Sequence, residues 1–176
     1  DPVLKEAREV LDIPVVSLAE TGMLVGCMYG SKFSVVTYQR QVIRKKYDQL
    51  VSAYGLSSRA VAGQYFDVGL DVLANSFDNP EPVLKEFEKA GERAVDCGAE
   101  VILPGCGLLN LIIVQNGMTN IKGATILDVS AALMKVAEAM IVMKRVSGIS
   151  NSRSGLYEAP TKDQLDAAND VYNFEI

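Results

Sequence analysis

Histidine and tryptophan are both absent from the 176 residues. The absence of histidine excludes Ser-His-Asp triads, Cys-His dyads and metal sites built on imidazole. Aromatic residues make up only 7% of the chain, whereas 49% of its residues are hydrophobic. That apolar fraction is enough to build a core and excludes disorder for most of the chain.

Paired cysteines are missing as well. The three cysteines, Cys27, Cys97 and Cys106, are an odd number, and no two of them have CxxC spacing. Their spacing therefore predicts neither a zinc site nor a disulfide framework. Because free thiols are typical of a reducing compartment, we expect a cytoplasmic protein without a bound metal.

The chain has neither an excess of basic residues nor an apolar run long enough to cross a membrane. The chain has 17 basic and 22 acidic residues, a net charge of −5. Nucleic-acid binding needs clustered Lys and Arg against phosphates, so we expect no nucleic-acid partner. The most apolar run, residues 101–114, is too short to span a bilayer and contains Pro104 and two glycines, so we expect no membrane segment.

What the chain does contain is an alternation of helical and extended patterns. Short β-branched runs predict strands at residues 13–18, 32–37, 60–68, 100–103 and 124–128. Three- and four-residue apolar spacing predicts helices at residues 2–11, 20–29, 39–54, 81–95 and 130–146, and another helix can begin at residue 108. The first helix has Asp1 as its expected N-cap, and the tail beyond residue 147 is expected to be loop. Strands separated by helices predict an α/β fold with mostly parallel sheets flanked by helices.

Two predicted strand ends carry side chains suited to chemistry. Cys106 lies between Gly105 and Gly107, directly after one strand and directly before a helix. A helix N-terminus favours a thiolate, and flanking glycines let a substrate approach backbone N–H groups that can hold a carboxylate or imide oxygen. A buried structural cysteine in a tight turn explains the same spacing, and local sequence does not decide between the two.

The other strand end carries two hydroxyls. Thr37 and Tyr38 close the run at residues 32–37 and can donate hydrogen bonds to the same ligand. The alternative roles are ordinary: Thr37 as the N-cap of the next helix and Tyr38 as a packing residue. Cys27 lies on an apolar helix and Cys97 at a helix end, and both are interpreted as structural.

Several of these segments, taken in order, resemble the aspartate/glutamate/hydantoin racemase family, and the hydantoin-racemase branch in particular. The resemblance rests on Asp1-Pro2-Val3-Leu4, on residues 13–16 and 33–37, on Gly98 to Gly107, on residues 124–128 and on residues 155–160. Each motif is short, but together they cover nearly the whole chain.

The resemblance implies a two-lobed α/β enzyme with a substrate cleft between the lobes and one cysteine from each lobe. One thiolate removes a proton from a carbon acid, and the opposite thiol returns a proton to the other face, without cofactor or metal. By this resemblance, Cys106 is the acid/base group of the second lobe. Thr37 then corresponds to the residue whose hydroxyl lies at the end of a strand in that lobe. Tyr38, Gly105 and Gly107 follow by adjacency as substrate-binding residues. The expected substrate is a hydantoin, allantoin or amino acid with a carboxylate or imide group, and the expected assembly is a homo-oligomer.

The chain departs from the family at its start. The family's first cysteine lies just before the Asp-Pro with which this sequence opens, and neither Cys27 nor Cys97 matches its position. We therefore expect an incomplete first lobe: residues 1–30 a remnant of it, 31–128 the second lobe with Cys106, and 129–176 a closing helix and tail that return to the first lobe.

Two other functions stay open. An arylmalonate-decarboxylase-like enzyme of the same superfamily relies on one cysteine in the second lobe, and one candidate cysteine is visible here. A non-catalytic α/β binding protein would keep the fold with an unreactive Cys106.

Overall fold

The computed structural model describes residues 1–38 and 41–172, and these divide into two compact units. One unit comprises Ser17–Val136, and the other combines Asp1–Val16 with Ala137–Ile176. The first of these holds the sheet and is called the sheet unit below; the second is called the terminal unit.

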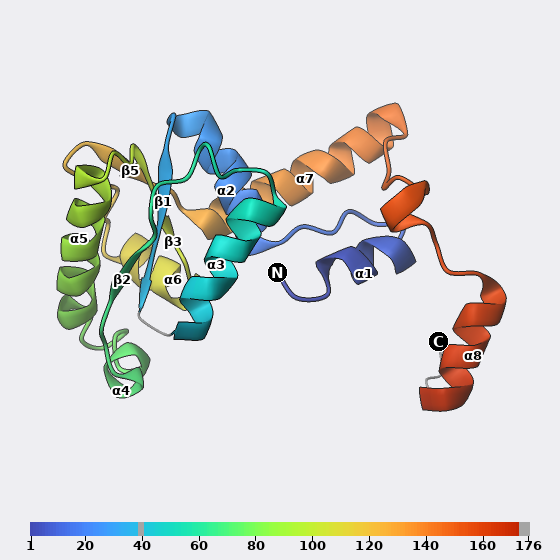
Figure 1. Cartoon of the computed structure of the whole chain (residues 1–176), viewed down its shortest axis with the longest axis horizontal. Helices are drawn as coiled ribbons and strands as arrows, with labels where there is room; N and C mark the ends of the chain where they lie inside the picture. The colour runs from blue at the N-terminus through green and yellow to red at the C-terminus, as the bar shows by residue number, and fades with distance from the viewer. Residues whose placement is uncertain (39–40, 173–176) are drawn as a thin grey trace. The chain divides into compact units, whose positions relative to one another are not determined.

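The sheet unit consists of alternating helices and strands (Figure 1). In chain order they are α2 (Leu18–Tyr29), β1 (Phe33–Tyr38), α3 (Gln41–Ala53), β2 (Gln64–Phe66), α4 (Leu70–Ala74), α5 (Glu81–Asp96), β3 (Val101–Pro104), α6 (Gly107–Gln115), β4 (Asn120–Ile121), β5 (Ala124–Ile126) and the first part of α7 (Val129–Ser147).

The five strands form one sheet in the order β2-β1-β3-β5-β4. Neighbours pair in parallel except β4 and β5, which form an antiparallel hairpin. In the central pair, Phe33 lies opposite Val101 and Val36 opposite Pro104. The expected α/β fold with a mostly parallel, helix-flanked sheet is confirmed.

Helices cover both faces of this sheet because its strands are apolar on both sides. On one face Val36 and Ile102 pack with Phe87 of α5 and Ile112 of α6. On the other face Val35 and Leu103 pack with Met23 of α2, and the partly buried Leu50 of α3 joins them. Alternate residues of β1 therefore face opposite helical layers, as the two-residue period of a strand requires. Each fully buried side chain of this size contributes about 1.5–3 kcal/mol to folding.

The terminal unit contains α1 (Leu4–Val10), the second part of α7, the 3₁₀ turn η1 (Gly155–Tyr157) and α8 (Lys162–Tyr172). The loop expected beyond residue 147 is thus partly helical. The signal for α8 is a capping box, since the Thr161 N–H donates to Gln164 Oε1 at 2.8 Å and the Gln164 N–H to Thr161 Oγ1 at 3.3 Å.

Two further expectations about local structure are wrong, and one strand has no counterpart among those predicted. Residues 13–18 form no strand within the described residues: 13–17 are irregular, and Ser17 is the N-cap of α2. A β-branched run becomes a strand only beside a partner strand, and none pairs with it there. Val3 rather than Asp1 is the N-cap of α1. The hairpin strand β4, which turns at Lys122 and Gly123, was not expected.

No helix of the described ranges is both long and apolar enough to cross a membrane. The division at residues 1–30, 31–128 and 129–176 concerns the lobes of a two-lobed molecule and stays a prediction.

Candidate functional site

The strand order places a branch point between β1 and β3. After β1 the chain passes through α3 to β2 on one side, and after β3 it passes through α6 to β5 on the other. Helices α3 and α6 pack on opposite faces of the sheet. Where neighbouring parallel strands send their connections in opposite directions, a crevice opens outside their carboxyl ends, and open α/β sheets bind ligands there.

Both strand ends singled out from the sequence meet at this branch point. Thr37 and Tyr38 end β1, while Gly105 and Cys106 follow β3. The Gly105 N–H donates to the carbonyl oxygen of Val36 at 2.9 Å. The Tyr38 hydroxyl donates to Cys106 Sγ at 3.8 Å. Residues 68 positions apart in the sequence therefore share one edge of the sheet.

Cys106 is the N-cap residue of α6 and is half-buried. Its carbonyl oxygen accepts the first helical hydrogen bond, from the Asn110 N–H at 2.9 Å. No side chain of the described residues caps this helix. The N–H groups of the first helical turn have no acceptor within a helix, so a carboxylate or imide oxygen can bind there, beside the thiol.

Thr37 is fully buried, and its Oγ1 has no hydrogen-bond partner among residues 1–38 and 41–172. A buried hydroxyl left without a partner costs about 1–3 kcal/mol, so this site favours a polar ligand atom or a water next to Thr37. A Cβ added at Gly105 would lie 2.8 Å from Thr37 Cβ, which shows how closely the two residues pack.

Gly107, the other glycine beside Cys106, is in a different situation. A Cβ added there would meet only Leu18 Cδ2, at 3.9 Å, which is ordinary contact. Space therefore requires glycine at residue 105 but not at residue 107. The substrate-binding role predicted for both residues stays a prediction.

Tyr47 of α3 is a part of the site that the sequence analysis missed. Its hydroxyl donates to the Gly105 carbonyl oxygen, and so ties α3 to the turn before Cys106. Burial raises the pKa of Tyr47 well above its ordinary value, and electrostatic repulsion from Cys106, Tyr38 and Tyr65 raises it further. The phenol therefore stays protonated and remains a donor. Helical periodicity places Tyr47 on an apolar face but does not show that this face covers the end of β3.

Asn110 is a second residue of the site whose role the sequence pattern does not reveal. It is 1% exposed, and its amide donates to Asp128 Oδ1 at 2.8 Å and to Ser130 Oγ at 3.1 Å. Its own Oδ1 accepts the Val129 N–H at 3.1 Å. Asn110 thus connects α6, which carries Cys106, to the start of α7. The signal was a lone amide inside the apolar run that follows Cys106.

The other two cysteines lie away from this edge. Cys27 is near the end of α2, immediately before β1, and Cys97 is at the end of α5, before β3. Both therefore lie toward the edge where these strands begin. Cys106 is the only one of the three cysteines at the carboxyl edge.

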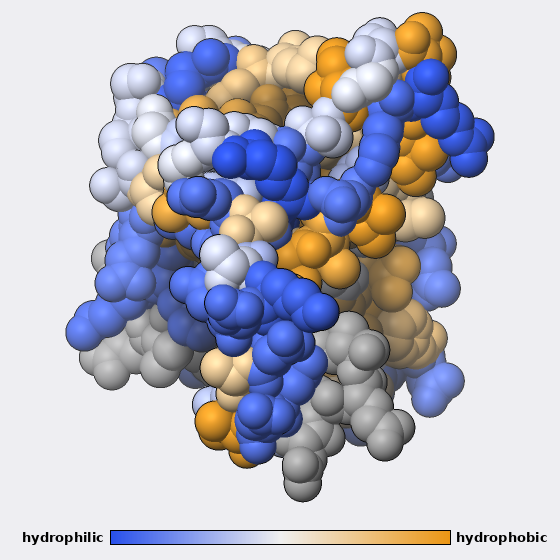
Figure 2. Space-filling model, turned by 90° about the vertical axis from the view of Figure 1, so that its right-hand side faces the viewer, coloured by the Kyte–Doolittle hydropathy of each residue, from blue (hydrophilic) through white to orange (hydrophobic). Residues whose placement is uncertain are grey.

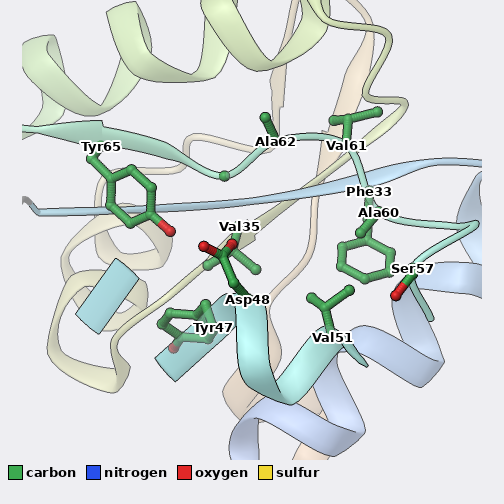
Figure 3. A pocket seen from close by; sticks show the side chains of 11 residues that line it. Phe33, Val35, Tyr47, Asp48, Val51, Ser57, Ala60, Val61, Ala62 and Tyr65 are labelled. Carbon is green, nitrogen blue, oxygen red and sulfur yellow. The ribbon is translucent and has the colours of Figure 1, made fainter. Parts of the chain in front are cut away.

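A cavity of about 220 Å³ lies next to the site, between α3 and the strands β1 and β2 (Figure 3). Phe33, Val35 and Val51 form its apolar wall, and the side chains of Asp48 and Tyr65 point into it. Tyr47 lines the cavity and also donates to the Gly105 carbonyl oxygen, so its side chain connects this space to the turn before Cys106. No group of three or more His, Cys, Asp or Glu side chains in the described ranges is arranged to hold a metal ion.

The chain is similar to known proteins in both sequence and fold. The family model described as Asp/Glu/Hydantoin racemase matches residues 1–137. A hydantoin racemase of Pseudomonas sp. (strain NS671) is 32% identical over 165 residues, which cover 93% of this chain and 62% of that protein. A hydantoin racemase of Paenarthrobacter aurescens is 26% identical over 165 residues, which cover 93% of this chain and 66% of that protein. The chain thus spans less than two thirds of the length of these curated relatives.

Among solved structures, allantoin racemase from Klebsiella pneumoniae has a similar fold. Its TM-score is 0.73 at 23% identity, over 92% of this chain and 62% of that one. At this level of identity the likeness establishes the fold.

Proposed function

Because the chain belongs to the Asp/Glu/hydantoin racemase family, we propose that the protein is a racemase in which Cys106 moves a proton to or from a carbon-acid substrate. The family resemblance seen in the sequence motifs is thereby confirmed, while the activity, the thiol mechanism and the substrate are proposals. We propose a hydantoin, allantoin or amino acid as substrate, because each carries an acidic C–H next to an oxygen that can take up charge.

One observation carries this proposal: the only cysteine at the carboxyl edge lies at the branch point between β1 and β3. In the proposed reaction the Cys106 thiolate takes the proton from the substrate carbon and becomes a thiol. The electron pair of the broken C–H bond moves onto the neighbouring carbonyl oxygen. The uncapped N–H groups of α6 and the buried Thr37 hydroxyl are suited to stabilise that oxygen.

Inversion needs a second proton donor on the opposite face of the substrate, because a single group returns the proton to the side it came from. Cys27 and Cys97 lie toward the other edge of the sheet, so neither fits this role. We propose that the second group comes from the first lobe, and that the lobes divide as the sequence analysis predicts.

The decisive experiment replaces Cys106 by serine in the protein that carries both lobes. Racemisation should fall by about 100-fold or more, and so should exchange in deuterated water of the C–H proton of the enantiomer that Cys106 deprotonates, because a hydroxyl is a much weaker base than a thiolate. Cys97→Ser is the matched control and should leave both rates unchanged. Full activity of the Cys106→Ser protein would rule out the thiol mechanism.

A single-cysteine decarboxylase is the second candidate, because such an enzyme uses one cysteine at this edge and Cys106 is the one that the described residues place there. Such an enzyme would release CO₂ from a disubstituted malonate and use Cys106 to protonate the resulting carbanion. Release of CO₂ from an arylmalonate, together with failure to exchange the proton of a hydantoin, would support decarboxylation over racemisation.

A further inference from the structure

Tyr38 and Thr37 are consecutive residues that face opposite sides of the sheet. Tyr38 packs with Val36 against the α5 and α6 layer, and Cys106 packs against the same apolar cluster. Thr37 lies on the side of Val35, against Gly105. Two hydroxyls on opposite sides of one strand cannot approach a ligand in the same way. The two positions can therefore serve different roles, and the substrate-binding role that the sequence predicts for both stays a prediction.

The Tyr38 hydroxyl is aimed at the sulfur of Cys106, to which it donates at 3.8 Å. Both side chains are only partly exposed, so water competes less for this hydrogen bond than it would at an open surface. Tyr47 does not duplicate it, because its hydroxyl donates to the Gly105 carbonyl oxygen. Among these contacts, the donor that reaches the sulfur belongs to Tyr38.

We propose that Tyr38 is a catalytic residue whose hydroxyl donates a hydrogen bond to the Cys106 thiolate and thereby increases the share of Cys106 that is ionised. Its part in racemisation rests on the proposed function, whereas its effect on the thiol does not. Hydrogen bonds to an ionised acceptor are roughly twice as strong as those between neutral groups, so the donor favours the thiolate over the thiol.

In this role the proton moves from the substrate carbon to Cys106. The thiolate takes the substrate proton, an S–H bond forms as the C–H bond breaks, and the electron pair goes to the substrate oxygen. The phenol keeps its own proton throughout. When the thiol later gives its proton to solvent or product, Tyr38 again stabilises the sulfur as an anion. Tyr38 thus acts directly on the reacting sulfur atom.

The test is alkylation of Cys106 by iodoacetamide in the absence of substrate, followed by mass spectrometry of the peptide. In Tyr38→Phe the rate should fall about threefold at pH 7 and rise about threefold at pH 10. A thiolate that has lost its hydrogen bond is less abundant near neutral pH. Once formed it is more nucleophilic, since nucleophilicity rises with basicity. The two rate profiles should therefore cross.

Two internal controls accompany this measurement. Cys97 is exposed and lies toward the other edge, so its alkylation rate reports on overall folding and should not change. Tyr29→Phe removes the hydroxyl of an exposed tyrosine and should leave the Cys106 profile unchanged. Equal Cys106 rates in Tyr38→Phe and the parent at both pH values would overturn the proposal. A change in the same direction at both pH values would indicate altered access and would overturn it too.

This outcome is separate from the fate of the proposed function. Undiminished racemisation by Cys106→Ser would refute the thiol mechanism, while the alkylation profiles would still report on Tyr38. If both proposals hold, Tyr38→Phe should lower kcat/KM for racemisation more at neutral pH than at alkaline pH.

Discussion

At the scale of single residues, Gly105 is a position where one methyl group does not fit. An added Cβ would lie 2.8 Å from Thr37 Cβ and 2.9 Å from Val35 Cγ1, and both neighbours belong to β1, the strand next to β3. The glycine thus lets the turn before Cys106 approach β1 closely enough for Tyr38 to reach the sulfur. In the sequence, Gly105 and Gly107 are equivalent neighbours of Cys106, and only the packing separates their roles.

We therefore predict that Gly105→Ala lowers the free energy of unfolding by about 2 kcal/mol, as overpacking in a rigid core does. Gly107→Ala is the matched control, because its Cβ meets only ordinary contact. It should change the free energy of unfolding by about 0.5 kcal/mol or less. Urea denaturation of the two variants measures both values, and equal stabilities would contradict the packing argument.

At the scale of secondary-structure elements, α1 is held by a side chain from a distant part of the chain. The Arg153 guanidinium donates to the carbonyl oxygens of Arg8, Glu9 and Leu11, at 3.0, 2.7 and 2.9 Å. It also pairs with the Asp12 carboxylate, and this hydrogen bond and its charge lower the pKa of Asp12. Carbonyl groups at a helix end lack partners within the helix, so Arg153 serves as the C-terminal cap of α1.

Arg153→Ala should speed hydrogen exchange of the α1 amides by about fivefold, which corresponds to the modest strength of partly exposed charged contacts. Arg145→Ala, which changes an exposed arginine of α7, is the control and should leave these amides unchanged. The measurement is hydrogen exchange resolved by peptide. Unchanged α1 exchange in Arg153→Ala would show that the cap does not stabilise the helix.

At the scale of the whole molecule, the buried core belongs almost entirely to the sheet unit. Among the described residues, Leu4 is the only buried hydrophobic side chain of the terminal unit. Many of that unit's apolar side chains are exposed instead, and orange apolar patches are visible among the polar residues in Figure 2. The exposed residues include Val10, Ile13, Ile141, Val142, Met143, Val146 and Ile149. The predicted homo-oligomer and first lobe would each supply cover for apolar surface, and both stay predictions.

We expect the terminal unit to open without unfolding the sheet unit, because local stability follows buried apolar contacts. Helices α5 and α8 provide a direct comparison: α5 buries Val83, Phe87 and Ala90, whereas α8 buries none of its described side chains. The α8 amides should exchange at least about 100-fold faster than those of α5. Comparable protection of the two helices would show that the terminal unit is stabilised by contacts beyond those within it.

Local pattern accounts for much of the fold. The apolar spacing of α5 follows from one buried helix face, and the β-branched residues of β1 follow from a strand buried on both sides. The β-branched pattern at residues 13–18 wrongly predicts a strand, because a strand forms only beside a partner strand that is distant in the sequence. It also missed α8, although the capping box of Thr161 and Gln164 is a local signal.

The sequence by itself determined the available chemistry: without histidine, the thiols were left as the main acid/base groups, and only Cys106 followed a strand between two glycines. Tertiary structure alone decided that β1 and β3 are neighbours, that Tyr38 reaches the Cys106 sulfur, and that Tyr47 holds the turn. The physical reason is how far apart in the sequence the interacting residues lie. Helix and turn formation depend on nearby residues, whereas the order of parallel strands depends on how distant apolar faces pack together.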